Sequence, residues 1–330
     1  RGEYSESDNA IRQMLATLGL VRAAKLERWA DLAGAAAANL ERNLRTYFVD
    51  RGDHGAFACS GKGKLGATAL GALCVLEHEG PDGPHARIFE KLRAGVDRLW
   101  QADGSFRTFF WPAERNDCQN FYPGEALLLY ASLYRRTGET DLRERARRTF
   151  RYYRDWHRAR PNPAFIPWHT QACVGLFRAI GDPELCNFVF EMNDRLISTQ
   201  QWGGDLPPDV WGRFYDPTWP GYGPPHAAST GVYLEGLAFA YALASETGDD
   251  ARADAYRTAI RRGLRNLRQL QVVSDADMFY VSKPARVWGG IRTEVYNNEI
   301  RLDNMGHAML ALLDLPSWSV ADAPAAAAGG

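Results

Sequence analysis

The chain has 330 residues, 45% of them hydrophobic, so it is long enough to bury a large core and its composition argues against disorder. Its 39 basic and 40 acidic residues give a formal charge of -1, and neither sign forms a long block, so charge gives no reason to expect a nucleic-acid or anionic-membrane partner. The longest apolar runs, such as 126–133, are far shorter than the ~20 residues that a membrane span needs. We therefore expect a soluble protein without a membrane span, in a compartment (cytoplasmic, periplasmic or secreted) that the sequence leaves open.

Apolar residues recur with a helical period along the chain, and almost no segment alternates as a strand would. Six segments are rich in Ala, Gly and Leu and apolar on nearly all sides, which is typical of buried helices. In chain order these are 11–20, 65–77, 124–134, 169–180, 229–245 and 304–313. Five charged, amphipathic segments lie between them, namely 25–47, 85–101, 141–158, 183–200 and 250–271.

The strict alternation of the two kinds predicts an inner ring of buried helices wrapped by outer helices, which is an all-α, (α/α)6 toroid. Three buried helices end at a glycine, Gly138, Gly181 or Gly248, and an acidic residue follows each, as expected for a helix end next to a helix start. Only eleven helices are clear, so the twelfth is absent, formed by the N-terminal residues or outside this sequence. We expect a single domain over 1–320 and an Ala/Gly-rich tail over 321–330.

The connections between helices are of two lengths. Links from a buried to an amphipathic helix are short, whereas 48–64, 102–123, 202–228 and 272–303 are long loops in the opposite direction. These loops are all expected at the face that carries the N-termini of the buried helices, whose free N–H groups and positive dipole ends point into the mouth of the ring. Long loops in compact domains are usually functional, so this face is where we expect the site.

The alternation resembles that of the six-hairpin, or (α/α)6-toroid, carbohydrate-active proteins, which include glycoside hydrolases, polysaccharide lyases and the N-acylglucosamine 2-epimerase group. The segments FYPGEALLLYASLYRRTGETD (121–141), ASTGVYLEGLAFAYALASETGDDARADAYR (228–257) and EIRLDNMGHAMLALL (299–313) carry the resemblance. It covers nearly the whole chain but is architectural, and no family-defining catalytic motif is matched residue by residue. It implies a carbohydrate substrate.

The segment 298–307 is the densest polar cluster, and it enters the last buried helix. Asp303 and His307 are four residues apart and share a helix face. In a structural interpretation Asp303 is an N-cap, Arg301 is its ion-pair partner and His307 is a core histidine. In a functional interpretation Asp303 or Glu299 is a working carboxylate, and Arg301 holds an acidic or hydroxylated substrate.

Glu125 lies in the first turn of another buried helix, just after Tyr122. The helix dipole alone would favour an acidic residue there. However, the rest of this helix is apolar, so the carboxyl is expected inside the ring with a raised pKa, as a general acid requires. Glycosidic cleavage needs two carboxyl groups, about 5 Å apart for retention and roughly 6.5 to 9.5 Å apart for inversion. Glu125 with Asp303 is the preferred pair, and the competing loop carboxylates are Asp117, Asp205, Asp209 and Asp216.

Histidines offer an alternative chemistry. His169 follows Trp168 at the start of a buried helix, and His226 lies just before another. Such histidines are more often structural, but if His169, His226 and His307 converge, an acid/base pair of His169 and His307 would favour a sugar epimerase or isomerase. No HxxEH or similar pattern is present, so we expect neither a metal site nor a cofactor.

Aromatic side chains are frequent in two of the long loops. Those predicted to bind substrate are Trp111 and Tyr122 in one case and Trp202 and Trp211 in the other, with Trp168 and His226 at helix starts. They either form apolar clusters beneath the loops or provide stacking surfaces for sugar rings, with the interleaved Asp205, Asp209, Asp216 and Arg213 binding hydroxyl groups. Asp117 and Glu299 are further substrate-binding candidates.

The preferred hypothesis is therefore a glycoside hydrolase that acts on an oligo- or polysaccharide, with Glu125 and Asp303 as the acid and the base or nucleophile. The alternative is an epimerase or isomerase. A third hypothesis is a non-catalytic toroid that binds a glycan or a protein, or that is a module of a longer chain.

Overall fold

A computed structural model describes residues 4–5 and 7–315 of the chain. It divides the chain into two compact units, an N-terminal unit of Glu6–Val189 and a C-terminal unit of Phe190–Gly330 with Arg1–Ser5. Each unit is described by itself below, and the expectation of a single domain over 1–320 stays a prediction. The tail expected over 321–330 lies outside the described residues.

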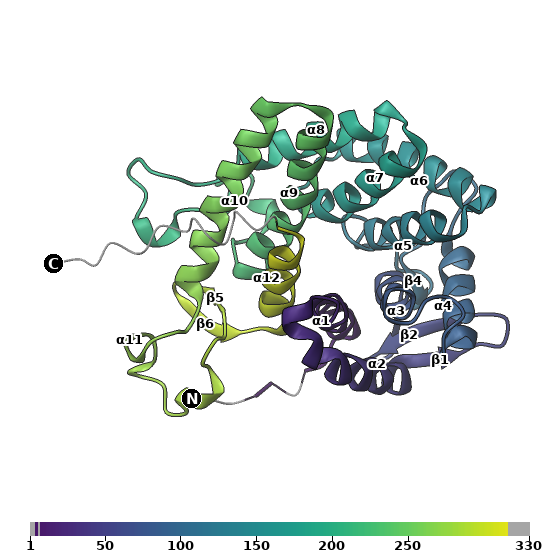
Figure 1. The fold of residues 1–330 in the computed structure, drawn as a ribbon, viewed down its shortest axis with the longest axis horizontal. Helices are drawn as coiled ribbons and strands as arrows, with labels where there is room; N and C mark the ends of the chain where they lie inside the picture. The colour runs from purple at the N-terminus through teal and green to yellow at the C-terminus, as the bar shows by residue number, and fades with distance from the viewer. Residues whose placement is uncertain (1–3, 6, 316–330) are drawn as a thin grey trace. The chain divides into compact units, whose positions relative to one another are not determined.

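Buried and outer helices alternate in the N-terminal unit (Figure 1). The buried helices are α1 (Ala10–Ala23), α3 (Leu65–His78), α5 (Tyr122–Thr137) and α7 (Ile166–Ile180). The outer helices are α2 (Ala33–Tyr47), α4 (Ala86–Leu99) and α6 (Thr140–Ala159), and α8 (Pro183–Ile197) runs across the boundary to the C-terminal unit. Successive buried helices pack on one another, α1 on α3, α3 on α5 and α5 on α7. The first three also pack on the outer helix that follows each of them, α1 on α2, α3 on α4 and α5 on α6.

The C-terminal unit continues the alternation with α9 (Ala227–Thr247), α10 (Asp250–Leu270) and α12 (Leu302–Asp314), of which α9 packs on both others. Its long loops contain the four-residue helix α11 (Asp275–Met278) and the hairpin of β5 (Arg292–Glu294) and β6 (Asn297–Ile300). Short 3-10 helices complete the two units: η1 (Glu27–Leu32), η2 (Pro163–Phe165), η3 (Pro208–Val210), η4 (Pro220–Tyr222) and η5 (Pro284–Arg286).

The eleven helices expected from the sequence are all present, so the all-α class and the alternation are confirmed. The start of the first outer helix differs, since 27–32 form η1 instead of α-helix. The three glycines expected to end buried helices do so, with left-handed φ of 69° at Gly138, 70° at Gly181 and 73° at Gly248. In the described part of the chain, no helix is both long and apolar enough to cross a membrane.

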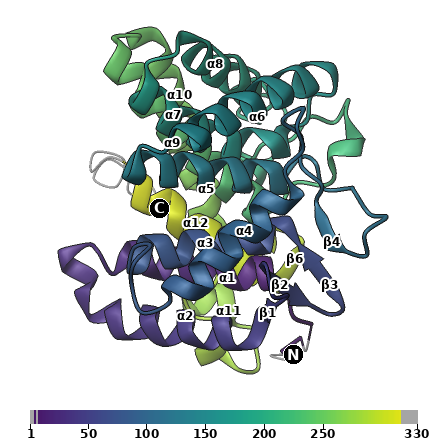
Figure 2. The ribbon, with the colours of Figure 1, turned by 90° about the vertical axis from the view of Figure 1, so that its right-hand side faces the viewer.

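The sequence analysis expected almost no strands, and the few short strands that the described residues form lie in three of the long loops. An antiparallel sheet of β1 (Phe48–Asp50), β2 (Gly55–Cys59), β3 (Lys62–Lys64) and β4 (Phe109–Trp111), in that order, joins the loop before α3 to the loop before α5 (Figure 2). Each strand has only three to five residues, which is too short for a pattern of alternation to stand out. The register places Ala58 opposite Gly63 and Lys64 opposite Phe109.

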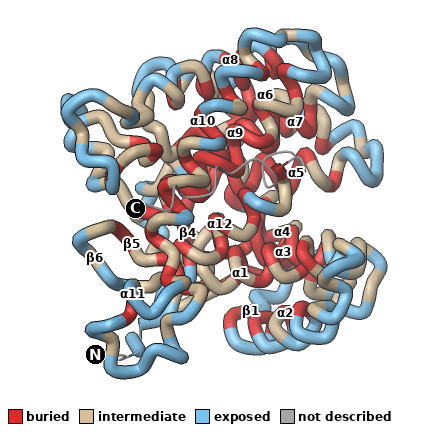
Figure 3. Tube along the Cα trace, turned by 60° about the vertical axis from the view of Figure 1, so that its left-hand side comes forward, coloured by how far each residue is buried: buried red, intermediate tan, exposed pale blue. Residues whose placement is uncertain are grey.

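Burial follows the composition of the helices (Figure 3). Every residue of α3 from Leu65 to Leu76 is buried, whereas α4, an outer helix, buries a single stripe of Phe89, Leu92, Gly95, Val96 and Leu99. The buried helices α3 and α5 therefore begin next to the four-stranded sheet of β1 to β4, at the edge of the apolar core.

Candidate functional site

One candidate region, in the N-terminal unit, is the junction of β3 and α3. Lys64 is both the last residue of β3 and the N-cap of α3, with extended backbone angles and no side-chain cap hydrogen bond. The N–H of Leu65 donates to the Thr108 carbonyl (3.0 Å), which ties the start of α3 to the loop that leads into β4. The half-buried Lys64 side chain is therefore held at the N-terminal end of a buried helix.

Glu125 lies in the first turn of α5, as expected, and is only 3% exposed. Its Oε2 atom is buried and has no hydrogen-bond partner among the described residues. A Cβ atom at Gly66 would overlap Glu125 Oε2, so the carboxyl lies directly against the first turn of α3. Burial raises the pKa of Glu125 to about 8, and the positive charge of Lys64 opposes this rise only in part. At neutral pH the group is therefore mainly protonated, which confirms the raised pKa expected from the sequence.

The start of α7 lies against the start of α5. A Cβ atom at Gly124 would come within 2.7 Å of the Trp168 Cβ and 2.8 Å of His169 Nδ1, so only glycine allows this approach. The His169 ring stacks on Phe165 and donates from Nδ1 to the Phe165 carbonyl (3.0 Å), leaving Nε2 buried without a partner. Burial lowers the pKa of His169 to about 3, so the ring is neutral at physiological pH.

Three other predicted residues lie at the start of α5 or in the strand and loop before it. Tyr122 is buried, whereas Asp117 is exposed and forms a two-pronged ion pair with Arg115, which lowers the Asp117 pKa. Trp111 is partly exposed, and the Arg51 guanidinium lies 4.4 Å from its ring centroid. The environments of Asp117 and Glu125 thus push their pKa values in opposite directions, the pattern that separates a base from an acid.

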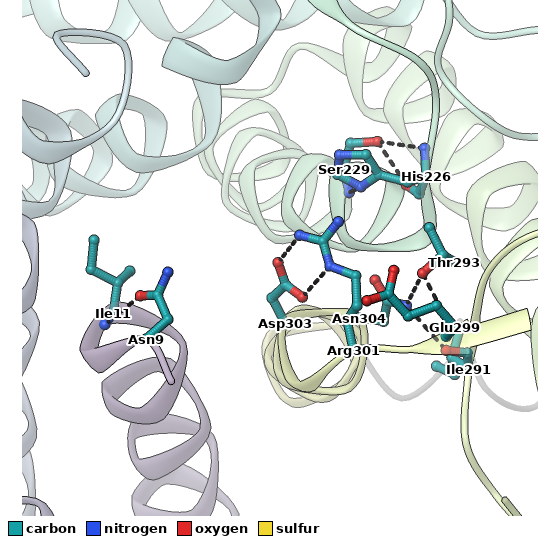
Figure 4. A network of polar contacts seen from close by, with 10 residues as sticks. All are labelled: Asn9, Ile11, His226, Ser229, Ile291, Thr293, Glu299, Arg301, Asp303 and Asn304. Carbon is teal, nitrogen blue, oxygen red and sulfur yellow. Dashed lines mark hydrogen bonds and ion pairs between the residues drawn. The ribbon is translucent and has the colours of Figure 1, made fainter. Parts of the chain in front are cut away.

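A separate candidate region, in the C-terminal unit, is the start of α12 (Figure 4). Arg301 is the N-cap of α12 and donates from Nε and Nη2 to the two Asp303 oxygens (2.9 and 2.5 Å). The ion pair of the structural interpretation is therefore present, but Asp303 as N-cap is wrong, because Asp303 lies one residue inside the helix. Glu299 is exposed on β6, and its backbone carbonyl accepts a hydrogen bond from Thr293.

His307, one turn further along α12, hydrogen-bonds through Nδ1 to Glu235 Oε1 (2.7 Å). Glu235 lies on α9 and is fully buried. His226 is the N-cap of α9, where its Nδ1 accepts from the Ser229 N–H (3.0 Å) within a capping box, so its imidazole holds the helix start (Figure 4).

Two tryptophans predicted to bind sugar contact the outer helix α10 instead of a buried helix. The rings of Trp202 and Trp211 lie 5.3 Å apart, and Arg265 of α10 lies within 5.7 Å of both centroids. Trp168 is buried at the start of α7, and Asp205 is exposed in the loop before η3. The aromatic residues are thus divided between buried packing and cation–π contacts with arginine.

The sequence matches no known protein-family model and no curated protein. Solved structures do match. One is an α-1,6-mannanase from Salegentibacter sp. HEL1_6, with 10% identity, 94% of this chain and 90% of that chain covered, and a TM-score of 0.66. A cellobiose 2-epimerase from Bacillus thermoamylovorans B4167 shows 12% identity over 92% of this chain and 86% of its own, with a TM-score of 0.60. A D-mannose isomerase shows 10% identity over 92% and 86%, with a TM-score of 0.65.

The chain has the (α/α)6-toroid fold. This confirms the resemblance drawn from the helix alternation. Identities of 10 to 12% carry the fold and not the activity.

The structure brings together Glu125, Tyr122 and Trp168 with His169 in the N-terminal unit, and Arg301 with Asp303 in the C-terminal unit. The pairing of Glu125 with Asp303 joins residues of different units and stays a prediction.

Sequence reasoning missed Lys64, Glu235 and Glu294, although Lys64 and Glu235 each carried a signal in the sequence. Lys64 is a charge directly before an apolar helix, and Glu235 is a lone charge in the middle of one. Glu294 binds Arg213 (2.5 Å), a residue that the sequence had suggested for sugar hydroxyls.

Proposed function

We propose that the protein is a carbohydrate-active enzyme that cleaves a glycosidic bond, with Glu125 as its general acid. The observation that carries this proposal is the Glu125 carboxyl itself, buried at the start of a buried helix, without a partner for Oε2 and with a pKa of about 8. A carboxyl group that keeps its proton at neutral pH can donate it to the glycosidic oxygen as the bond to the leaving sugar breaks.

The reaction also needs an ionised carboxylate. Asp303 is our first candidate, because the two N–H groups of Arg301 compensate the charge of both its oxygens. Asp117 is the second candidate, since Arg115 holds its pKa low. The chosen carboxylate acts as nucleophile or as base towards water, depending on whether it lies about 5 Å or roughly 6.5 to 9.5 Å from Glu125.

The solved structures of sugar-active proteins with this fold support the proposal, but they do not identify the catalytic residues of this chain. The Salegentibacter mannanase is described in complex with α-1,6-mannotriose as an inactive variant in which two consecutive aspartates are replaced. In this chain the only consecutive acidic residues are Asp249 and Asp250, at the start of the outer helix α10. Asp249 caps that helix by accepting from the Arg252 N–H (3.1 Å). We therefore infer that the carboxyl groups of this protein come from separate elements.

Substitution of the three carboxyl groups tests the proposal. Glu125→Gln, Asp303→Asn and Asp117→Asn would be assayed for release of reducing ends from a panel of oligo- and polysaccharides. We expect Glu125→Gln to lose at least about 100-fold in rate, as is usual on removal of a general acid, and one of the two aspartate variants to lose as much. Glu77→Gln is the matched control, because Glu77 is a largely buried carboxylate that is ion-paired with Arg22. Full activity of Glu125→Gln on every cleaved substrate would contradict the proposal.

A second candidate function, sugar epimerisation or isomerisation, is favoured by the His307–Glu235 contact. A buried glutamate that accepts from Nδ1 fixes the tautomer of the histidine in which Nε2 carries the lone pair. His169, with a pKa of about 3, is poorly suited to be the second base of such a reaction. Deuterium from solvent at a sugar carbon of the product, lost in His307→Asn, would establish this chemistry, and ligand binding without any turnover would favour a non-catalytic toroid.

A further inference from the structure

The Lys64 ammonium has no anionic partner in the described part of the chain. It is half-buried, and no hydrogen bond or ion pair to it is formed within the described residues. The carboxyl group nearby is that of Glu125, but the two groups do not approach within ion-pair distance and act on each other only through their electrostatic field. A half-buried cation without a counter-ion is costly, so this site favours the arrival of a negative charge.

The surroundings of Lys64 increase the positive potential. Lys62, two residues earlier on β3, and Arg115 both act on Lys64 as like charges. Asp117, the acidic residue of the same loop, already binds Arg115 through both of its oxygens. Since Glu125 is protonated at neutral pH, it does not cancel these charges either.

The start of α3 adds hydrogen-bond donors at the same place. This helix has 14 residues, its N-cap is Lys64, and its first turn has neither a capping side chain nor an acidic residue. The Leu65 N–H donates to the Thr108 carbonyl, but within the described residues the N–H groups of Gly66 and Ala67 form no hydrogen bond, and they lie at the positive end of the helix dipole. The Glu125 carboxyl, buried and without a partner for Oε2, lies directly against this turn at Gly66. A cationic side chain, helix N–H groups and a protonated carboxyl all donate hydrogen bonds. Such a set of donors is complementary to an anionic group that only accepts hydrogen bonds.

We propose that this site binds the carboxylate of a hexuronate, so that the substrate of the enzyme is an acidic glycan and Lys64 selects it. The inference rests on the proposed function, because it places the acidic sugar beside the general acid Glu125. A neutral sugar would leave the Lys64 charge uncompensated in its half-buried position. A carboxylate pairs with that charge and uses the free donors of the α3 turn.

Calorimetric binding with matched ligands tests this proposal. The probes are oligosaccharides of polygalacturonate, polymannuronate and polyglucuronate, each compared with the same oligosaccharide after its carboxyl groups have been reduced to alcohols. We expect at least one acidic oligosaccharide to bind about tenfold or more tightly than its reduced form. Lys64→Gln should abolish this difference, Lys64→Arg should restore part of it, and Lys62→Gln should retain it.

The outcomes separate the inference from the proposed function. Wild-type protein without any preference for an acidic oligosaccharide, or a preference that survives in Lys64→Gln, overturns the role of Lys64. An equal loss of the preference for the acidic oligosaccharide in Lys64→Gln and Lys62→Gln overturns it as well. Such a result would indicate that the general positive potential of this surface, and not the Lys64 ammonium itself, binds the acidic sugar. A melting temperature of Lys64→Gln close to wild type shows that the variant is folded. Tight, Lys64-dependent binding of an acidic oligosaccharide without cleavage supports the inference and contradicts the hydrolase.

Discussion

Replacement of Glu125 by glutamine should change how the stability of the protein depends on pH. The pKa of Glu125 is about 8 in the folded protein and near 4.5 in the unfolded chain, because burial disfavours the charged form. Between these two values the folded state holds a proton that the unfolded state has released. The stability contributed by the protonated group is therefore fully present below pH 4.5 and is lost progressively as the pH rises towards 8.

The size of the effect follows from the shift. One pKa unit corresponds to about 1.4 kcal/mol, so wild-type protein should lose about 4 kcal/mol relative to Glu125→Gln between pH 5 and pH 8. Glutamine has the same shape and cannot ionise, so the variant lacks this loss. Urea unfolding at several pH values measures the difference, provided that far-UV circular dichroism and tryptophan fluorescence give coincident transitions.

Glu77→Gln gives the control with the opposite sign. Burial alone would raise the pKa of Glu77, but the ion pair with Arg22 outweighs burial and lowers it. The stability that ionised Glu77 contributes is present above its unfolded pKa and is lost as the pH falls, so this variant should differ from wild type most at neutral pH. Parallel stability curves for wild type and Glu125→Gln between pH 5 and pH 8 would refute the reasoning about the buried carboxyl.

Three further substitutions test the surroundings of the site and the fold. Gly66→Ala should destabilise the protein by about 1 to 3 kcal/mol and reduce turnover, because the added Cβ overlaps Glu125 Oε2; unchanged melting temperature and activity would contradict that contact. Gly138→Ala should lower the free energy of unfolding by about 1 kcal/mol, and with it the urea midpoint, because φ is 69° at this position. An equal or higher midpoint would show that the end of the helix relaxes to accept the side chain. Arg213→Met should cost about 3 to 5 kcal/mol in thermal unfolding by leaving the buried Glu294 unpaired, and most of that loss should be recovered when Glu294 is also replaced by leucine.

The fold was largely predictable because the helices differ so strongly in composition. A segment such as 65–77 has no polar stripe, so it can only be stable when other helices surround it, and the amphipathic segments between such helices must cover them. The sheet was not predictable. Strands as short as β3 (Lys62–Lys64) are held by pairing with β2 and β4, and β4 is distant in sequence.

The candidate site was predictable where a single residue differed in polarity from its neighbours in the sequence. Glu125 is a carboxyl in an otherwise apolar helix start, and its burial and raised pKa follow from that position. Contacts between elements were not predictable in the same way. The partner of His307 is Glu235, which lies 72 residues away on α9, and no local pattern connects the two. His226 looked equally suited to chemistry, yet its position before Ser229 makes it a helix cap.

The junction at Lys64 has a consequence for engineering. Lys64 ends a strand and is also the N-cap of a helix, so an insertion or deletion at this point would have two effects at once. It would shift the register of β3 against Phe109, and it would turn the first residues of α3 away from Glu125. Residues 62–66 should therefore stay fixed in any library designed to alter specificity. Diversity is better placed in the exposed residues 51–53 and 113–114, which form no strand pairs and can vary in length while Lys64 and the Arg115–Asp117 pair keep their places.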